Sequence, residues 1–254
     1  MSESDQMASV VLPTYNEREN IKPLIEAILA QVQRPVELVV VDDDSPDGTW
    51  QVVQDMAAQE PRIRLLRRTE ERGLTSALNA GIRLARGEVI AWMDCDHSMP
   101  PEVLPTLLAA ADEVDLAVGS RYVQGAADVG HSLVAQLFSR TINLAASLLL
   151  GRKIRDYTSG FLAVRRPVFD EITLQGDYGE YCIDLLARAQ RLGFTIREVP
   201  YHCVPRLQGE SKTATNVAGY IRRGWKYVMT VLRLRMVFTT EKILHWRQPH
   251  VTAH

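Results

Sequence analysis

Two aspartates, Asp94 and Asp96, stand one residue apart directly after an apolar run at residues 89–93. If that run is a buried strand, both carboxylates lie where the strand ends, and they can face one hard cation such as Mg²⁺. Such an ion would neutralise a departing diphosphate. Two solvated turn residues are the alternative, because an Asp-x-Asp pair alone is a weak signal. The position after an apolar strand and before a predicted helix favours a metal site.

The residues around this pair offer further contacts. His97 and Ser98 are candidates for further ligands. Ser98 would coordinate a metal directly or through water, whereas a lone histidine at such a position more often contacts the ligands or is solvated. Side chains alternate along an extended chain, so Cys95 should point away from the metal. We expect Cys95 to fill a small packing space and to offer its backbone to a ligand.

A second acidic cluster occupies residues 42–44, at the end of the predicted strand 37–41, and Ser45-Pro46-Asp47-Gly48 follows as a turn. Asp47 is expected to cap the helix that begins there. The three preceding acids repel one another unless a ligand or donor offsets them. Acidic side chains at strand ends commonly accept hydrogen bonds from ribose hydroxyls, so this cluster predicts a nucleoside site.

Short β-branched runs alternate with helical patterns through the first half of the chain. This alternation predicts an α/β fold with a mostly parallel sheet and helices on both faces, and ligands bind outside the carboxyl ends of such strands. The polar clusters after four of the strands should therefore meet at one edge. The predicted strands are 10–12, 37–41, 63–66, 89–93, 116–119, 161–164 and 195–199, and the predicted helices are 17–33, 47–59, 74–85, 102–111, 131–150, 181–192 and 216–236.

Composition narrows the class of protein. The chain has 254 residues, of which 46% are hydrophobic and 24% charged, and a net charge of −2, which argues against a nucleic-acid-binding domain. Three scattered cysteines favour a reducing compartment. The polar N-terminus shows no secretory signal, and the longest apolar run, residues 144–150, is far below the roughly 20 residues that span a bilayer. A chain of this kind would lie on a membrane rather than cross it.

The predicted helix 216–236 carries an apolar stripe that includes Trp225 and Leu232, with arginines and lysines off the stripe. A basic amphipathic helix of this type is typical of membrane interfaces, although packing on the core explains the stripe equally well. The helix 131–150 has the same ambiguity, and the two together would form a slot for an isoprenoid chain. We expect a catalytic domain at 1–215 and an amphipathic C-terminal extension at 216–254.

Several motifs together resemble the family-2 glycosyltransferases, above all the dolichyl-phosphate (polyprenyl-phosphate) mannosyltransferases. They are LPTYNEREN from residue 12, VDDDSPDGT from 41, MDCD from 93, GSRY from 119, TSGF from 158, EVP from 198 and GESK from 209. The resemblance covers roughly residues 8–228. It implies a Rossmann-like GT-A fold, a GDP-mannose donor, Mg²⁺ or Mn²⁺ as the cofactor and a lipid-phosphate acceptor.

The resemblance also suggests roles for single residues. It assigns the nucleoside to Pro13, Tyr15, Glu17, Val41 and Asp43, the metal and diphosphate to Asp94, Cys95, Asp96 and Ser98, and the phosphates of donor or acceptor to Arg121, Arg206 and Lys212. The chain departs from the family in two places. Basic residues are absent from 134–136, which leaves open how the acceptor phosphate is held, and Cys182 replaces an expected glutamine.

The chemistry depends on the acceptor. A phosphate monoester is already a dianion near neutral pH, so it needs no general base, and direct displacement would invert the anomeric centre. A hydroxyl acceptor would need a base, for which Asp184 is the best candidate, although a pair with Arg188 explains it equally well. A UDP-sugar-dependent transferase and a non-catalytic scaffold with the same fold are the alternatives. A phosphatase would need a D-x-D-G-type loop after its first strand, where this chain has Pro-Thr-Tyr-Asn.

The expected partners are a nucleotide-sugar donor, a polyprenyl phosphate and a membrane surface, but not nucleic acid. We expect peripheral attachment on the cytoplasmic face of a membrane, with or without a separate anchoring subunit.

Overall fold

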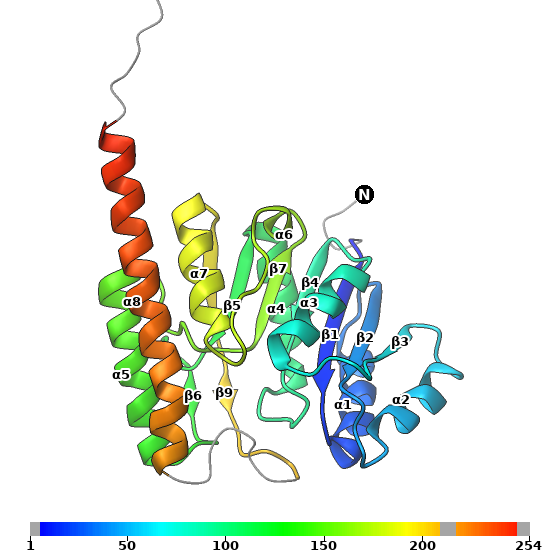
Figure 1. Cartoon of the computed structure of the whole chain (residues 1–254). Coiled ribbons are helices and arrows are strands. Elements are labelled where there is room, and N and C mark those ends of the chain that lie inside the picture. The colour runs from blue at the N-terminus through cyan, green and yellow to red at the C-terminus, as the bar shows by residue number, and fades with distance from the viewer. Residues whose placement is uncertain (1–5, 209–216, 248–254) are drawn as a thin grey trace, which may run out of the picture.

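The structure, a computed structural model, describes residues 6–208 and 217–247, with the helix backbone alone for 217–223 and 241–247. Its main sheet has seven strands: β1 (Ala8–Thr14), β2 (Val36–Asp42), β3 (Ile63–Arg67), β4 (Val89–Trp92), β5 (Leu116–Ser120), β7 (Leu162–Arg165) and β8 (Ile196–Pro200). They lie in the order β3-β2-β1-β4-β7-β5-β8 (Figure 1). The pairs β1–β2, β1–β4, β2–β3 and β5–β8 are parallel. The predicted strands and the mostly parallel sheet are confirmed.

Helices cover both faces of this sheet, as predicted. Two buried apolar clusters flank it: one takes side chains from α1 and α4, and the other takes them from α3, α5, α7 and α8. A pair of two-residue strands, β6 (Ala127–Asp128) and β9 (His202–Cys203), forms a separate parallel ladder that was not predicted. The helices are α1 (Arg18–Gln31), α2 (Thr49–Ala57), α3 (Leu74–Leu84), α4 (Leu104–Glu113), α5 (Leu133–Leu150), α6 (Val168–Glu171), α7 (Tyr181–Leu192) and α8 (Val217–Arg247).

The central strands are apolar because they are covered on both sides. Every residue of β2, β4 and β5 is buried, which is typical of strands in the interior of an α/β sheet. The helix α3 approaches the sheet closely at Gly81, where a Cβ atom would collide with the side chain of Val11 on β1. The rigid sheet therefore fixes where each strand ends and which side chains meet there.

Strand β7 runs against its neighbours. It pairs antiparallel with β4, where Val89 faces Arg165, and with β5, where Leu116 faces Val164. Its amino end therefore lies at the edge where β4 and β5 have their carboxyl ends. The turn at residues 158–160, which precedes β7, is brought to that edge in consequence.

Helices α5 and α8 lie side by side (Figure 1). They meet closely at Gly224 of α8, where an added Cβ would collide with the ring of Phe138. Val231 and Leu234 of α8 are buried in the core, so this helix packs on the protein through one face. Its other face and that of α5 expose large apolar side chains: Leu133, Val134, Leu137, Leu144, Leu148, Leu149, Trp225, Met229, Leu232, Met236 and Val237.

The expectation that no segment is long enough to cross a membrane needs correction. Among the described residues, α5 has 18 residues and is long and apolar enough by length and composition, and only 17% of it is buried. The uninterrupted apolar run at residues 144–150 is shorter than this helix, because isolated polar residues such as Asn143 interrupt the apolar sequence. Asn143 is buried against the protein and donates a hydrogen bond to Thr158.

Candidate active site

A cavity of about 820 Å³ opens at the edge where the strands β1, β2, β4 and β5 end. The segments after these four strands all contribute to its wall, as predicted, and α5 and α8 close the other side. Val41, by contrast, is fully buried in β2 and does not line the cavity, so it could offer only its backbone. Lys212 lies outside the described residues. The predicted residues that the cavity does bring together are Pro13, Tyr15, Glu17, Asp43, Asp94, Cys95, Asp96, Ser98, Arg121 and Arg206.

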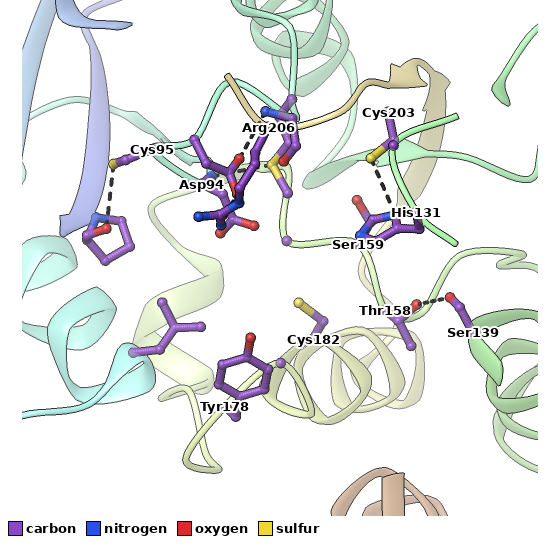
Figure 2. A pocket seen from close by; sticks show the side chains of 18 of the residues that line it. Asp94, Cys95, His131, Ser139, Thr158, Ser159, Tyr178, Cys182, Cys203 and Arg206 are labelled. Atoms are coloured by element: carbon purple, nitrogen blue, oxygen red, sulfur yellow. Dashed lines mark hydrogen bonds and ion pairs between the residues drawn. The ribbon is translucent and has the colours of Figure 1, made fainter. Parts of the chain in front are cut away.

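Asp94 and Asp96 both line one corner of the cavity. Figure 2 shows Asp94 there, beside Arg206. Enclosure by the cavity walls desolvates Asp94 and raises the pKa of this carboxyl, and the negative charges of Asp96 and Glu17 act in the same direction. Its side chain is nevertheless accessible from within the cavity. Asp96 accepts the backbone N–H of Ser98 at 2.9 Å. The corner therefore concentrates negative charge that a cation would offset.

This donor set fits Mg²⁺ or Mn²⁺. Carboxylate and hydroxyl oxygens are the ligands that hard divalent cations prefer, and Asp94, Asp96 and Ser98 all line the cavity here. The neighbouring side chains turn elsewhere: the His97 ring lies 3.2 Å from the carbonyl of Asn20, and the Cys95 thiol donates to the Pro13 carbonyl at 3.5 Å. Of the two interpretations given for His97, these contacts favour the one in which it is not a direct ligand, and the Cys95 contact agrees with a side chain that packs away from the carboxylates.

The segment after β9 lies over this corner. Arg206 donates to Asp96 Oδ2 at 2.6 Å, and the backbone N–H of Leu207 donates to the Asp96 carbonyl at 2.9 Å. The N–H of Val204 donates to the Ser98 carbonyl at 3.1 Å. Arg206 thus reaches the predicted diphosphate site from a segment more than a hundred residues away in sequence.

The acidic cluster at residues 42–44 already has protein donors. Asp42 accepts from Thr14 and Ser45, Asp43 pairs with Arg68, and Asp44 pairs with Arg67. Donors from the protein thus offset these acids, which is one of the two possibilities considered, and two of the donors are arginines at the end of β3 and directly after it. Asp43 nevertheless lines the cavity, where it also accepts the N–H of Gly73 at 2.7 Å.

Asp47 lies one residue before the N-cap of α2, which is Gly48, and still bonds the first turn of that helix. Its carboxylate accepts the backbone N–H of Thr49 at 2.9 Å, at the start of α2, and also that of Arg18 at 3.1 Å, at the start of α1. One side chain therefore ties together the first turns of two helices that follow β1 and β2.

Sequence reasoning missed Arg72 and Gly73. Both line the cavity, and the Arg72 guanidinium lies 5.4 Å from the ring centroid of Tyr15. Gly73 has a φ of +138°, a conformation that favours glycine, and α3 begins at the next residue. Both residues follow β3, so a search of the residues after every predicted strand would have included them.

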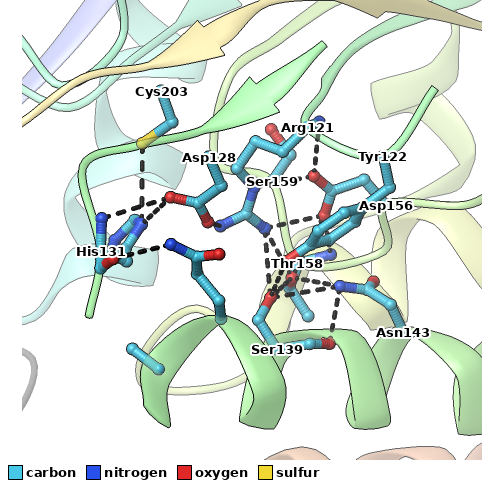
Figure 3. A network of polar contacts seen from close by, with 12 residues as sticks. Arg121, Tyr122, Asp128, His131, Ser139, Asn143, Asp156, Thr158, Ser159 and Cys203 are labelled. Carbon is cyan, nitrogen blue, oxygen red and sulfur yellow. Dashed lines mark hydrogen bonds and ion pairs between the residues drawn. The ribbon is translucent and has the colours of Figure 1, made fainter. Parts of the chain in front are cut away.

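Arg121 is held in a buried polar network (Figure 3). Its Nε atom donates to Asp156 Oδ2 at 2.8 Å. Its Nη2 atom donates to Asp156 Oδ1 at 2.8 Å and to the Thr158 hydroxyl at 2.9 Å. Its Nη1 atom lies 3.6 Å from Asp128. Burial opposes the charged form, but the Asp156 carboxylate outweighs it and raises the pKa of Arg121. Arg121 therefore brings a fixed positive charge to the cavity wall, with most of its donors already in use.

Asp184, the predicted base for a hydroxyl acceptor, lies away from the cavity. It is buried in α7, where it pairs with Arg188 at 3.4 Å and with Arg233 of α8 at 2.8 Å. Desolvation raises the pKa of Asp184, and the two arginines oppose that shift. The simpler explanation given for it, a pair with Arg188, is thus confirmed.

A second group of cavity residues was not predicted. The Nδ1 atom of His131 lies 2.8 Å from Asp128 and 3.7 Å from the thiol of Cys203 (Figures 2 and 3). Asp128 and Cys203 belong to β6 and β9, the ladder that no sequence pattern indicated. Cys182, which replaces an expected glutamine, also lines the cavity, and burial raises the pKa of its thiol.

The chain is similar to several curated proteins over most of its length. It is 38% identical over 208 residues to a dolichol-phosphate mannosyltransferase from Pyrococcus furiosus; the match covers 80% of this chain and 58% of that protein. It is 42% identical over 215 residues to a polyprenol monophosphomannose synthase from Mycolicibacterium smegmatis, covering 82% of this chain and 81% of the relative. The chain thus spans less than two thirds of the Pyrococcus protein but most of the mycobacterial one.

Solved structures show the same fold at lower identity. Glucosyl-3-phosphoglycerate synthase from Mycobacterium tuberculosis, in complex with Mn²⁺, UDP and phosphoglyceric acid, matches with a TM-score of 0.69 and 21% identity, covering 92% of this chain and 80% of that one. A mannosyltransferase from Pyrobaculum calidifontis, in complex with GDP-mannose and Mn²⁺, matches with a TM-score of 0.64 and 22% identity over 90% and 65% of the two chains. Residues 9–173 match the family model of glycosyl transferase family 2. With the strand-end carboxylates, the GT-A-like sheet and these relatives together, the chain belongs to glycosyl transferase family 2.

Proposed function

We propose that this protein transfers mannose from GDP-mannose to a polyprenyl phosphate by a metal-assisted displacement that inverts the anomeric centre. The observation that carries the proposal is the single cavity, which runs from the carboxylates of Asp94 and Asp96 to the partly apolar helices α5 and α8. Relatives 38% and 42% identical are named as mannosyltransferases acting on dolichol or polyprenol phosphates.

In this proposal the chain binds the donor along the ends of β1, β2 and β4. Tyr15 and Arg72 offer a ring and a guanidinium to the nucleoside end, and Asp43 a carboxylate. Asp94, Asp96 and Ser98 would hold Mg²⁺ or Mn²⁺, which neutralises the charge of the diphosphate leaving group.

Positive side chains supply most of the remaining stabilisation, because both reactants are anions. Arg206 stands at the diphosphate corner, where it bonds Asp96, and Arg121 stands in the wall beside α5. Fixed charges that face a developing diphosphate lower the barrier without reorganising during the reaction. An acceptor phosphate requires no base, which agrees with the position of Asp184 away from the cavity.

The proposal includes peripheral attachment to the cytoplasmic face of a membrane. Helices α5 and α8 pack on each other, and both expose large apolar side chains; large exposed apolar patches are typical of membrane or protein contacts. Trp225, which is 63% exposed, is the kind of residue that favours the headgroup region. As an alternative, a separate anchoring subunit would bind to the same exposed apolar side chains. Flotation with vesicles should be lost in a Trp225→Ser/Leu232→Ser variant, and unchanged flotation would contradict the attachment.

The transfer reaction is tested with labelled GDP-mannose, dolichyl phosphate and Mn²⁺, followed by organic extraction of the label. The Asp96→Ala variant should lose transfer while its thermal unfolding stays cooperative. Asp55→Ala, which removes an exposed carboxylate on α2, is the matched control and should keep full activity. Thermal shift with GDP against UDP, each with Mg²⁺ or Mn²⁺, separates the UDP-sugar alternative. Metal-independent donor binding by the wild type would favour the non-catalytic alternative.

A further inference from the structure

Among the described residues, the side of the cavity formed by α5 and α8 has few positive side chains. The first turns of α5 line it with Ser132, Ala135 and Ser139, which are short and uncharged. These side chains therefore offer no charge to the acceptor phosphate of the proposed reaction. Arg121 lies nearby, but its Nε and Nη2 atoms are bonded to Asp156.

His131 lies four residues before Ala135, at the start of α5, and it lines the same cavity. Its side chain is 46% exposed, whereas that of its partner Asp128 is 2% exposed. The Asp128 carboxylate engages Nδ1 of the ring at 2.8 Å, and the amide of Gln136 donates to the His131 carbonyl at 2.8 Å. The ring is thus fixed through one nitrogen, and Nε2 is the nitrogen left to bind a ligand.

The surroundings of His131 favour its charged form. The hydrogen bond to Asp128 and the contact with Cys203 outweigh the effect of burial and raise the pKa of His131 to about 10. The charged groups that face it are Asp128 and, across the cavity, Asp94, while Arg121 lies 3.6 Å from Asp128 on the other side. A histidine that stays protonated at neutral pH cannot serve as a general base, but it donates from both nitrogens.

We propose that His131, oriented by Asp128, donates an Nε2–H hydrogen bond to the phosphate of the acceptor lipid and supplies a positive charge that the cavity-lining residues of α5 lack. This inference rests on the proposed function and deepens it by naming the residue that recognises the acceptor. The phosphate is a dianion, so the bond joins two charged groups, which is the strong class of hydrogen bond.

A competing explanation uses the same three side chains. Ligand atoms of Asp128, His131 and Cys203 lie within 4.8 Å of one another, a grouping that would also suit a transition metal such as zinc. A zinc ion on Nδ1 would displace the contact with Asp128 and make His131 a neutral metal ligand, so the ring would no longer offer the positive charge that the phosphate attracts. Metal analysis of the purified protein therefore belongs to the test.

The test compares His131→Ala, His131→Gln and the double variant His131→Ala/Ala135→Arg with the wild type. His202→Ala is the matched control, because His202 lies on the neighbouring strand but not in the cavity lining. The kcat/KM for dolichyl phosphate should fall about 10- to 100-fold in both single variants, as expected for a lost hydrogen bond between charged groups. The KM for GDP-mannose should not change. The double variant should recover most of the loss, because it returns a cation one turn further along α5.

A second readout does not depend on turnover. In the wild type, dimethylallyl phosphate should shift the NMR signal of the His131 ring, and the His131→Gln variant should bind this probe more weakly by a similar factor. Equal kcat/KM for the lipid in wild type and His131→Gln would overturn the inference. So would an equal rise in the KM of GDP-mannose, or stoichiometric zinc whose removal reproduces the variant. A wild type that binds the prenyl phosphate through His131 but transfers no mannose would refute the proposed function and leave this inference standing.

Discussion

The buried ion pair between Arg121 and Asp156 gives the sharpest prediction about stability. Asp156 is fully buried, the Arg121 side chain is 9% exposed, and two bonds of 2.8 Å join them. Asp156 also accepts the backbone N–H groups of Arg121 and Thr158 at 3.0 and 3.2 Å. The Asp156→Ala variant would leave a buried guanidinium with Asp128 at 3.6 Å as its nearest carboxylate.

Breaking one side of a buried pair costs about 3–5 kcal/mol. For a protein of this length each kcal/mol lowers the melting temperature by about 2–4 °C, so Asp156→Ala should melt about 6–20 °C below the wild type. The control is Glu113→Ala, which removes the exposed pair with Arg197 at 2.7 Å and should cost less than about 1 kcal/mol.

Differential scanning calorimetry of both variants measures the contrast. The double variant Arg121→Leu/Asp156→Leu should recover part of the loss, because no charge then remains buried without a partner. If Asp156→Ala melted within about 2 °C of Glu113→Ala, the reasoning that burial makes this pair valuable would be refuted.

Three further predictions test other parts of the fold. Burial opposes ionisation of Glu37, but hydrogen bonds, above all that from Ser9, lower its pKa below the ordinary 4.5. The free energy of unfolding should therefore fall as the pH drops below 4.5. Thermal melts of Glu37→Gln at several pH values should show a weaker dependence of the melting temperature on pH in this range. Gly224→Leu should push α8 away from α5, which limited proteolysis would detect as faster cleavage of α8, whereas Thr239→Leu on the exposed side should not. Asp184→Asn should lower the melting temperature by weakening the α7–α8 contact but leave the KM of GDP-mannose unchanged; a selective loss of kcat would restore its role as a base.

The alternation of strands and helices was predictable because each central strand is continuously apolar and each helix has one apolar face. The direction of β7 was not, because its apolar pattern is the same whichever way the chain runs. The consequence is local: for an antiparallel strand, the residues before it reach the active edge. The turn at residues 158–160 therefore joins the cavity from the amino side.

The metal corner was predicted from two carboxylates after an apolar strand, and the cavity contains both. The partners of the other acidic cluster were not predicted, because the pairing of Asp43 with Arg68 depends on β2 lying beside β3. The group of Asp128, His131 and Cys203 was missed for the same reason. Two strands of two residues each bring them together, and strands that short leave no periodicity in the sequence.

Some parts of the cavity wall come from segments that lie far apart in the chain. Tyr15, Asp43 and Asp94 come from the first hundred residues, while Tyr178 and Tyr227 come from beyond residue 173, where the match to the family ends. Substitutions that reshape one side of the reaction chamber therefore need not disturb the other. Such a division of labour would let descendants of one ancestral enzyme keep a common nucleotide while diversifying the molecule that receives the sugar.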